Sequence, residues 1–231
     1  MTQLRKHNPV LEQKLLQYLR GGDAAGLCRF LSSLSVAEFR TAGYMLATSG
    51  LPLLTSEMFW DFFCTIVPTN SKAYLGTFLK AALAKVADNS LSLDFPSLKR
   101  FSMEATAIDK RKILVAFLPT ERHPDNVGRL MEIMCEQDID TYSSILTATE
   151  NVACYYVLFE ALKLHDATAE QLRRTCIQLM RRQTPRAFRF AAILKAYFGI
   201  ENLPGTFSLR LEPYKLGRLD GSFENFRKVM G

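Results

Sequence analysis

Apolar residues recur at helical spacing along almost the whole chain, from residue 9 to residue 198. A long stripe joins Leu75, Phe78, Leu79, Ala82, Leu83 and Val86, and similar stripes occupy residues 11–19, 36–46, 127–134 and 172–180. Because an α-helix turns once every 3.6 residues, this spacing gathers the apolar side chains on one face. The pattern therefore predicts a chain built almost entirely of amphipathic helices.

Helix-start signals agree with the stripes. A Ser or Thr followed three residues later by an acid or amide can exchange hydrogen bonds with the free amides of a first turn. Four such capping boxes begin at Ser35, Thr106, Thr147 and Thr168, and Thr184-Pro185 marks a further start. Together these signals predict about twelve helices, at residues 9–20, 23–33, 35–49, 55–67, 71–88, 94–105, 107–118, 124–137, 139–147, 148–165, 168–183 and 185–198.

Short links between these helices favour antiparallel neighbours. Expected hairpins start at Ser35, Asn70, Thr106, Asp138 and Thr168, which lie 30 to 36 residues apart. That is near the length of a helical-hairpin repeat, although no residue recurs at a fixed offset. We expect an all-α fold, an irregular α-solenoid of antiparallel helical hairpins, with a compact multi-helical domain as the alternative.

The last part of the chain differs from the rest. Residues 207–212 alternate apolar and polar side chains as a strand would, and Ser222 can cap a short final helix. We therefore expect two parts: a multi-helical domain at residues 1–200, HEAT-like or an irregular solenoid, and an extended C-terminal arm at 201–231. The arm either packs on its own domain or adds to a partner.

Composition and targeting signals limit where the chain works. Its five cysteines are odd in number and scattered, which excludes a small disulfide scaffold and fits a reducing compartment. No apolar run reaches the ~18 residues that a membrane span needs. The N-terminus lacks the apolar segment of a signal peptide. We expect a cytoplasmic protein without a membrane partner.

Charge is unevenly distributed along the chain, whose net charge is +6. Residues 121–150 hold seven acids: Glu121, Asp125, Glu132, Glu136, Asp138, Asp140 and Glu150. Residues 171–199 hold seven bases and no acid: Arg173, Arg174, Arg181, Arg182, Arg186, Arg189 and Lys195. Such asymmetry can steer a charged partner, or it can be two solvated faces of opposite sign.

The basic segment supplies the candidate binding residues. On the helix expected at 168–183, several polar side chains lie opposite an apolar stripe, and the next helix opens with two more arginines. Guanidinium groups suit paired contacts to phosphate or carboxylate. We identify as partner- or anion-binding candidates Arg174, Gln178, Arg181, Arg182, Arg186 and Arg189. The alternative is that Arg181 and Arg182 complement the dipole at the end of their own helix.

Motifs for catalysis are missing from the sequence. It contains no Gly-rich nucleotide loop, no nucleophile elbow and no His-Glu-x-x-His. The cysteines and Trp60 lie on apolar stripes, which is typical of core residues. Glu132 and Glu136 share a helix face, as on any solvated helix. We therefore assign no catalytic residue, no metal ligand and no cofactor.

Three hypotheses for function follow. The first is a non-catalytic helical interaction or scaffold module with a protein partner. The second is a nucleic-acid-binding protein that uses the arginine-rich face, and its binding should weaken steeply with salt. The third is an enzyme with an unrecognised site. The oligomeric state stays open.

Overall fold

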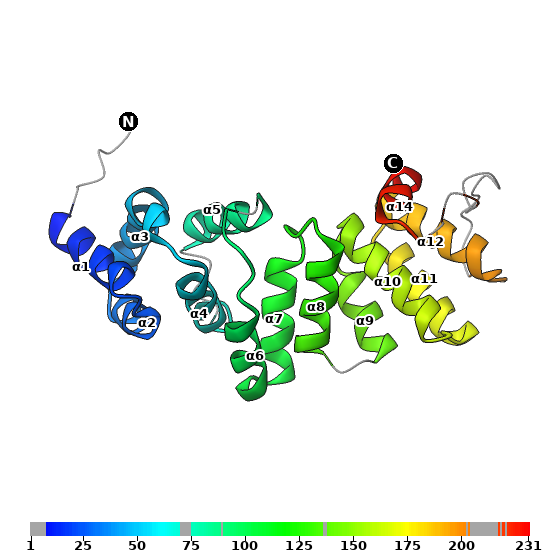
Figure 1. The fold of residues 1–231 in the computed structure, drawn as a ribbon, viewed down its shortest axis with the longest axis horizontal. Helices are drawn as coiled ribbons and strands as arrows, with labels where there is room; N and C mark the ends of the chain where they lie inside the picture. Colours follow the sequence, from blue (N-terminus) through cyan, green and yellow to red (C-terminus); the bar gives the residue numbers. More distant parts are fainter. Residues whose placement is uncertain are drawn as a thin grey trace. The chain divides into compact units, whose positions relative to one another are not determined.

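The computed structural model describes residues 8–69, 75–88, 90–135, 138–201, 203, 217, 219 and 221–231. The chain divides into two compact units, Met1–Ile113 and Leu114–Gly231, which we take in turn. The described residues form helices and the turns between them, with no strand among them, so the predicted all-α fold is confirmed (Figure 1). The solenoid arrangement and the division near residue 200 stay predictions.

The first unit is built from short helices with a strongly aromatic core. Its elements are α1 (Pro9–Arg20), α2 (Ala24–Ser32), α3 (Val36–Met45), the π-helical turn η1 (Leu46–Gly50), the 3₁₀ turn η2 (Leu51–Leu53), α4 (Ser56–Ile66), α5 (Gly76–Ala87), α6 (Phe95–Glu104) and most of α7 (Ala107–Phe117). Helix α4 packs against α2 and α6, while α5 packs against α3 and η1. Trp60 of α4 is fully buried and donates from Nε1 to the carbonyl oxygen of Ser92 at 2.9 Å.

The helix expected at 35–49 changes type in its second half. α3 ends at Met45, and residues 46–50 form a π-helical turn instead. This turn packs against α1 and α5. A Cβ atom added at Gly50 would lie 2.8 Å from Cδ1 of Leu19, so glycine permits this close approach of α1 and η1.

In the second unit, helices that are not consecutive in the chain pack against each other. It contains α8 (Pro124–Met134), α9 (Ile139–Leu146), α10 (Val152–Leu164), α11 (Ala169–Arg181), α12 (Pro185–Phe198) and α14 (Phe223–Met230). Helix α10 packs against α8, α9 and α14, and α11 packs against α9 and α12. Tyr155 and Phe190 stack in its core, with ring centroids 4.7 Å apart.

Most of the expected helix starts are confirmed by their hydrogen bonds. Complete capping boxes form at Ser35 and Thr168, and Thr184 accepts a hydrogen bond from the amide of Ala187. The box expected at Thr147 is wrong. Thr147 instead follows the last turn of α9 and donates its hydroxyl to Ser143, because the chain there is still leaving one helix.

The residue that starts α10 is Asn151, not Thr147. Its Oδ1 accepts from the amide of Ala153, and its Nδ2 donates to the carbonyl oxygens of Leu118 and Glu121. One side chain therefore caps α10 and holds the segment before α8. An amide can do both, because it carries a donor and an acceptor.

The final helix is confirmed at α14. Ser222 accepts from the amide of Asn225, and Phe226 is buried. The helix packs against α10 and α12 (Figure 1). This end of the chain therefore packs on its own unit. The strand expected at residues 207–212 lies outside the described residues.

Candidate functional site

The predicted arginine cluster lies on α11 and α12, which pack against each other. Arg174 is exposed and pairs with two acids, Asp140 at 3.6 Å and Glu170 at 3.5 Å. Gln178 is half-buried and accepts from the Thr147 hydroxyl at 3.2 Å. Exposed pairs of this kind contribute only about 0–1 kcal/mol, so Arg174 remains available to a stronger anion.

Two of the arginines converge on the loop between α9 and α10. Arg182 donates from Nη2 to the carbonyl oxygen of Ala148 at 2.8 Å. Arg186 donates from Nη1 to the carbonyl oxygen of Glu150 at 3.3 Å. The side chain of Arg182 thus reaches beyond its own helix end to a neighbouring loop. Both arginines stabilise the fold locally as well as presenting charge.

A buried tyrosine lies beside this loop. Tyr155 is fully buried, and its hydroxyl has no hydrogen-bond partner among the described residues. Burial raises its pKa to about 12, Glu150 adds to that effect, and the positive charges of Arg182 and Arg186 oppose it. The neutral phenol is therefore the form present at ordinary pH.

The remaining two candidates separate from this pair. Arg189 donates from Nη1 to the carbonyl oxygen of Met230, the last residue of α14, at 2.9 Å. Arg181 is exposed and makes no side-chain hydrogen bond or ion pair within the part of the chain that the structure describes. The structure therefore gives the six candidates different local roles on one pair of helices.

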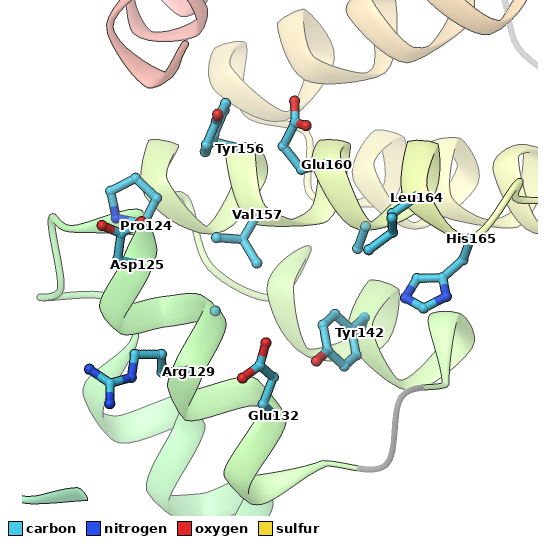
Figure 2. A pocket seen from close by; sticks show the side chains of 12 residues that line it. Pro124, Asp125, Arg129, Glu132, Tyr142, Tyr156, Val157, Glu160, Leu164 and His165 are labelled. Atoms are coloured by element: carbon cyan, nitrogen blue, oxygen red, sulfur yellow. The ribbon is translucent and has the colours of Figure 1, made fainter. Parts of the chain in front are cut away.

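An open groove of about 720 Å³ lies between α8, α9 and α10 in the second unit (Figure 2). Helix α8 contributes charged side chains and α9 contributes Tyr142, while α10 forms the opposite wall. The lining residues are Pro124, Asp125, Gly128, Arg129, Glu132, Tyr142, Tyr156, Val157, Glu160, Ala161, Leu164 and His165. All of them lie in the second unit.

The floor of the groove holds a tyrosine with a shifted pKa. Tyr142 is buried, and burial raises its pKa to about 12, with Cys135 and Glu132 adding to the shift. The Glu132 carboxylate therefore lies close enough to disfavour a second negative charge. Tyr142 stays a neutral hydrogen-bonding group rather than a base.

Helix α10 lines the groove with both apolar and polar side chains. The apolar ones are Val157, Ala161 and Leu164, and the polar ones are Tyr156, Glu160 and His165. Leu164 at the end of this helix is 79% exposed. Glu160 pairs with Lys163 at 3.1 Å, and the Lys163 ammonium lies 5.3 Å from the centre of the Phe159 ring. The groove thus offers exposed apolar surface next to carboxylates.

Tyr156 connects the groove to α14. It lines one end of the groove, and its hydroxyl donates to the carbonyl oxygen of Gly221 at 2.5 Å. Its ring packs edge-on against Phe226, with centroids 5.5 Å apart. The docked C-terminal helix therefore fixes one side chain of the groove.

The acidic segment is not a single solvated face. Glu121 is buried and accepts from the amides of Arg122 and His123, at 2.7 Å and 2.8 Å, and from Asn126. Its carboxylate thus binds two amides that precede α8 and one side chain of its first turn, while the His123 side chain does not cap that helix. Glu136 lies outside the described residues.

The cysteines are free thiols, and four of the five are buried. Burial raises the pKa of Cys28 to about 11 and those of Cys64, Cys154 and Cys176 to about 12. A nucleophilic or metal-binding cysteine needs the opposite shift. The expectation that these four residues belong to the core is confirmed.

The described residues contain no group of three or more His, Cys, Asp or Glu side chains placed to hold a metal ion. None of their helices has the length and apolar character to cross a bilayer.

Comparison with known proteins finds no match among family models, curated proteins or solved structures. The site must therefore be judged on its own geometry. Sequence reasoning placed Glu132 on a solvated face and missed the groove. The available signal was the spacing of Val157, Ala161 and Leu164 at i, i+4 and i+7, whereas the exposure of Leu164 is visible only in the structure.

Proposed function

We propose that this chain is a non-catalytic α-helical interaction module that binds a protein partner. The observation that carries the proposal is the open groove of about 720 Å³, where the 79% exposed Leu164 lies among charged side chains. Exposed apolar surface rimmed by polar groups marks interaction sites on folded proteins. The raised pKa values of Tyr142 and of buried thiols such as Cys154 keep these groups protonated, which favours a binding function over catalysis.

Nucleic-acid binding through the arginines has weaker support. Arg182 and Arg186 each commit one N–H group to a backbone carbonyl, and Arg174 pairs with Asp140 and Glu170. These contacts must be shared or broken before a phosphate binds. The five free thiols suit a reducing compartment, and we place the protein in the cytoplasm as part of the same proposal.

Affinity capture of the full chain from a lysate of its host tests the proposal. Three baits are compared: the parent, the groove variant Glu132→Lys/Leu164→Gln, and the arginine variant Arg173→Glu/Arg181→Glu. Each capture is repeated with nuclease and with NaCl raised from about 0.1 to about 0.5 M. All four substituted residues are exposed, so the variants should fold.

We expect a protein that survives nuclease, binds the arginine variant and is lost from the groove variant. A partner that disappears with nuclease, with salt and with the arginine variant would instead identify a nucleic-acid-binding protein. Binding that both variants retain would contradict the groove as the interaction site.

A further inference from the structure

The groove is asymmetric in charge. Three carboxylates line it, those of Asp125, Glu132 and Glu160, against the single guanidinium of Arg129. In Figure 2 the Glu132 carboxylate points into the hollow, whereas the Arg129 side chain extends away from it. Glu160 is partly balanced by Lys163. Neither Asp125 nor Glu132 makes an ion pair among the described residues, and Glu132 is the one whose carboxylate points into the middle of the hollow (Figure 2).

An apolar stripe faces this carboxylate across the groove. Val157, Ala161 and Leu164 follow each other at i, i+4 and i+7 along α10, and all three line the hollow. Val157 is half-buried and Ala161 is buried, whereas Leu164 is 79% exposed, so the stripe presents most of its apolar surface at Leu164. A ligand that lies along the groove would meet a carboxylate on one side and apolar surface on the other.

We infer that the groove binds a short basic peptide segment of a partner protein, with a lysine or arginine beside Glu132 and a large apolar side chain on Leu164 and Val157. This inference rests on the proposed function and gives its site a ligand class. The apolar contact supplies affinity, because burying apolar area is favourable. The charge pair sets orientation and excludes acidic segments.

A second copy of this chain fits the groove less well. One basic face that it could offer is α11, whose apolar side chains Leu172, Cys176 and Leu179 are buried in the unit's own core. The other apolar side chains of α11, Ile177 and Met180, are half-buried, so this face offers little apolar surface to cover Leu164. A partner segment that carries both kinds of side chain matches the groove on both walls.

Peptide selection on the immobilised full chain tests the ligand class without assuming a sequence. A random peptide library displayed on phage is selected against the parent, and the enriched peptides are synthesised with a fluorescent label. Their Kd is then measured by anisotropy on the parent and on three single variants: Glu132→Lys, Glu132→Gln and Leu164→Gln. Circular dichroism confirms that each variant is folded.

The first unit supplies a matched control. Met103 is 76% exposed and is followed by exposed Glu104, so Met103→Gln/Glu104→Lys makes the same kinds of change at residues that do not line the groove. We expect selected peptides rich in Lys or Arg and in Leu, Ile or Phe. Their Kd should rise about tenfold with Glu132→Lys or Leu164→Gln, less with Glu132→Gln, and stay unchanged in the control.

Several results would overturn the inference. They are peptides without a basic preference, failure to enrich any peptide, or a Kd that neither Glu132→Lys nor Leu164→Gln changes. Self-association that is lost in both Glu132→Lys and Arg173→Glu/Arg181→Glu, measured by sedimentation, would assign the groove to a second copy. None of these results removes a nuclease-resistant partner from the capture experiment, so the two proposals fail separately.

Discussion

Arg189 of α12 holds the C-terminal end of α14 through a hydrogen bond from its Nη1 to the carbonyl oxygen of Met230, at 2.9 Å. The last carbonyls of a helix have no partner within the helix, and a cation there also complements the dipole. A single guanidinium therefore links two elements 41 residues apart in the sequence.

Removing this guanidinium should loosen α14. We expect Arg189→Ala to lower the free energy of unfolding by about 1–2 kcal/mol, since it deletes a charge-assisted hydrogen bond. Hydrogen exchange at the amides of residues 223–230 should accelerate more than elsewhere. The control is Arg181→Ala on the neighbouring helix. Equal exchange in both variants would show that the bond does not hold α14.

Phe159 tests the core beneath α14. It is 1% exposed, and its ring contacts those of Tyr197, Phe198 and Phe226. Phe159→Ala should cost about 3–5 kcal/mol, because the cavity it leaves has aromatic walls that cannot all collapse. Phe159→Leu should cost less. Urea unfolding measures both, and an unchanged midpoint for the alanine variant would contradict this position for the core.

Local sequence signals predicted the helices well, because each depends on residues within one or two turns. The Ser35 and Thr168 boxes were found because cap and partner are three residues apart. The Thr147 box failed, since Asn151 caps α10 instead, and its side-chain amide also bonds to Leu118 and Glu121 some thirty residues away. The spacing of residues along the sequence does not predict hydrogen bonds between residues so far apart.

The candidate site was harder to predict for the same reason. A sequence shows that arginines are clustered, but not that Arg182 and Arg186 reach the carbonyls of another loop. The groove needs α8, α9 and α10 to be placed together, and its surface depends on which face each helix leaves open. In the sequence Glu132 looks like any exposed acid, because nothing there shows that Leu164 lies across the groove from it.

Any substitution of Asn151 that removes its acceptor Oδ1 or its donor Nδ2 should destabilise the fold. Asn151→Ala loses the cap and both donated bonds, and we expect a loss of about 2–3 kcal/mol. Asn151→Asp keeps the capping acceptor but turns a carboxylate toward two carbonyl oxygens, so it should cost more than alanine. Thermal unfolding of the two variants decides. An aspartate variant as stable as the parent would show that only the cap matters.

The buried thiols predict a loss of stability at alkaline pH. Burial raises the pKa of Cys154 from 9.0 to about 12 in the folded chain, so the thiolate forms more readily after unfolding. The stabilisation is fully present below pH 9 and is lost as pH rises toward 12, by about 1.4 kcal/mol per pH unit. Urea midpoints across this range should fall less steeply for Cys154→Ala. Parallel slopes would contradict the shift.

Charge reversal separates the structural arginines from the free ones. Arg182→Glu/Arg186→Glu breaks two bonds to carbonyls of the α9–α10 loop and brings carboxylates toward those oxygens, so it should lower the free energy of unfolding by about 1–3 kcal/mol. Arg173→Glu/Arg181→Glu changes the net charge equally at exposed positions and should stay within about 0.5 kcal/mol of the parent.

Thermal and urea unfolding of the two double variants measure the difference, and binding assays are then interpretable. A partner lost only with Arg182→Glu/Arg186→Glu would reflect the disturbed loop, because both variants remove the same charge. A partner lost with both would require the positive face itself. If the two variants are equally stable, the carbonyl contacts contribute little, and Arg182 and Arg186 are as available to an anionic partner as Arg181.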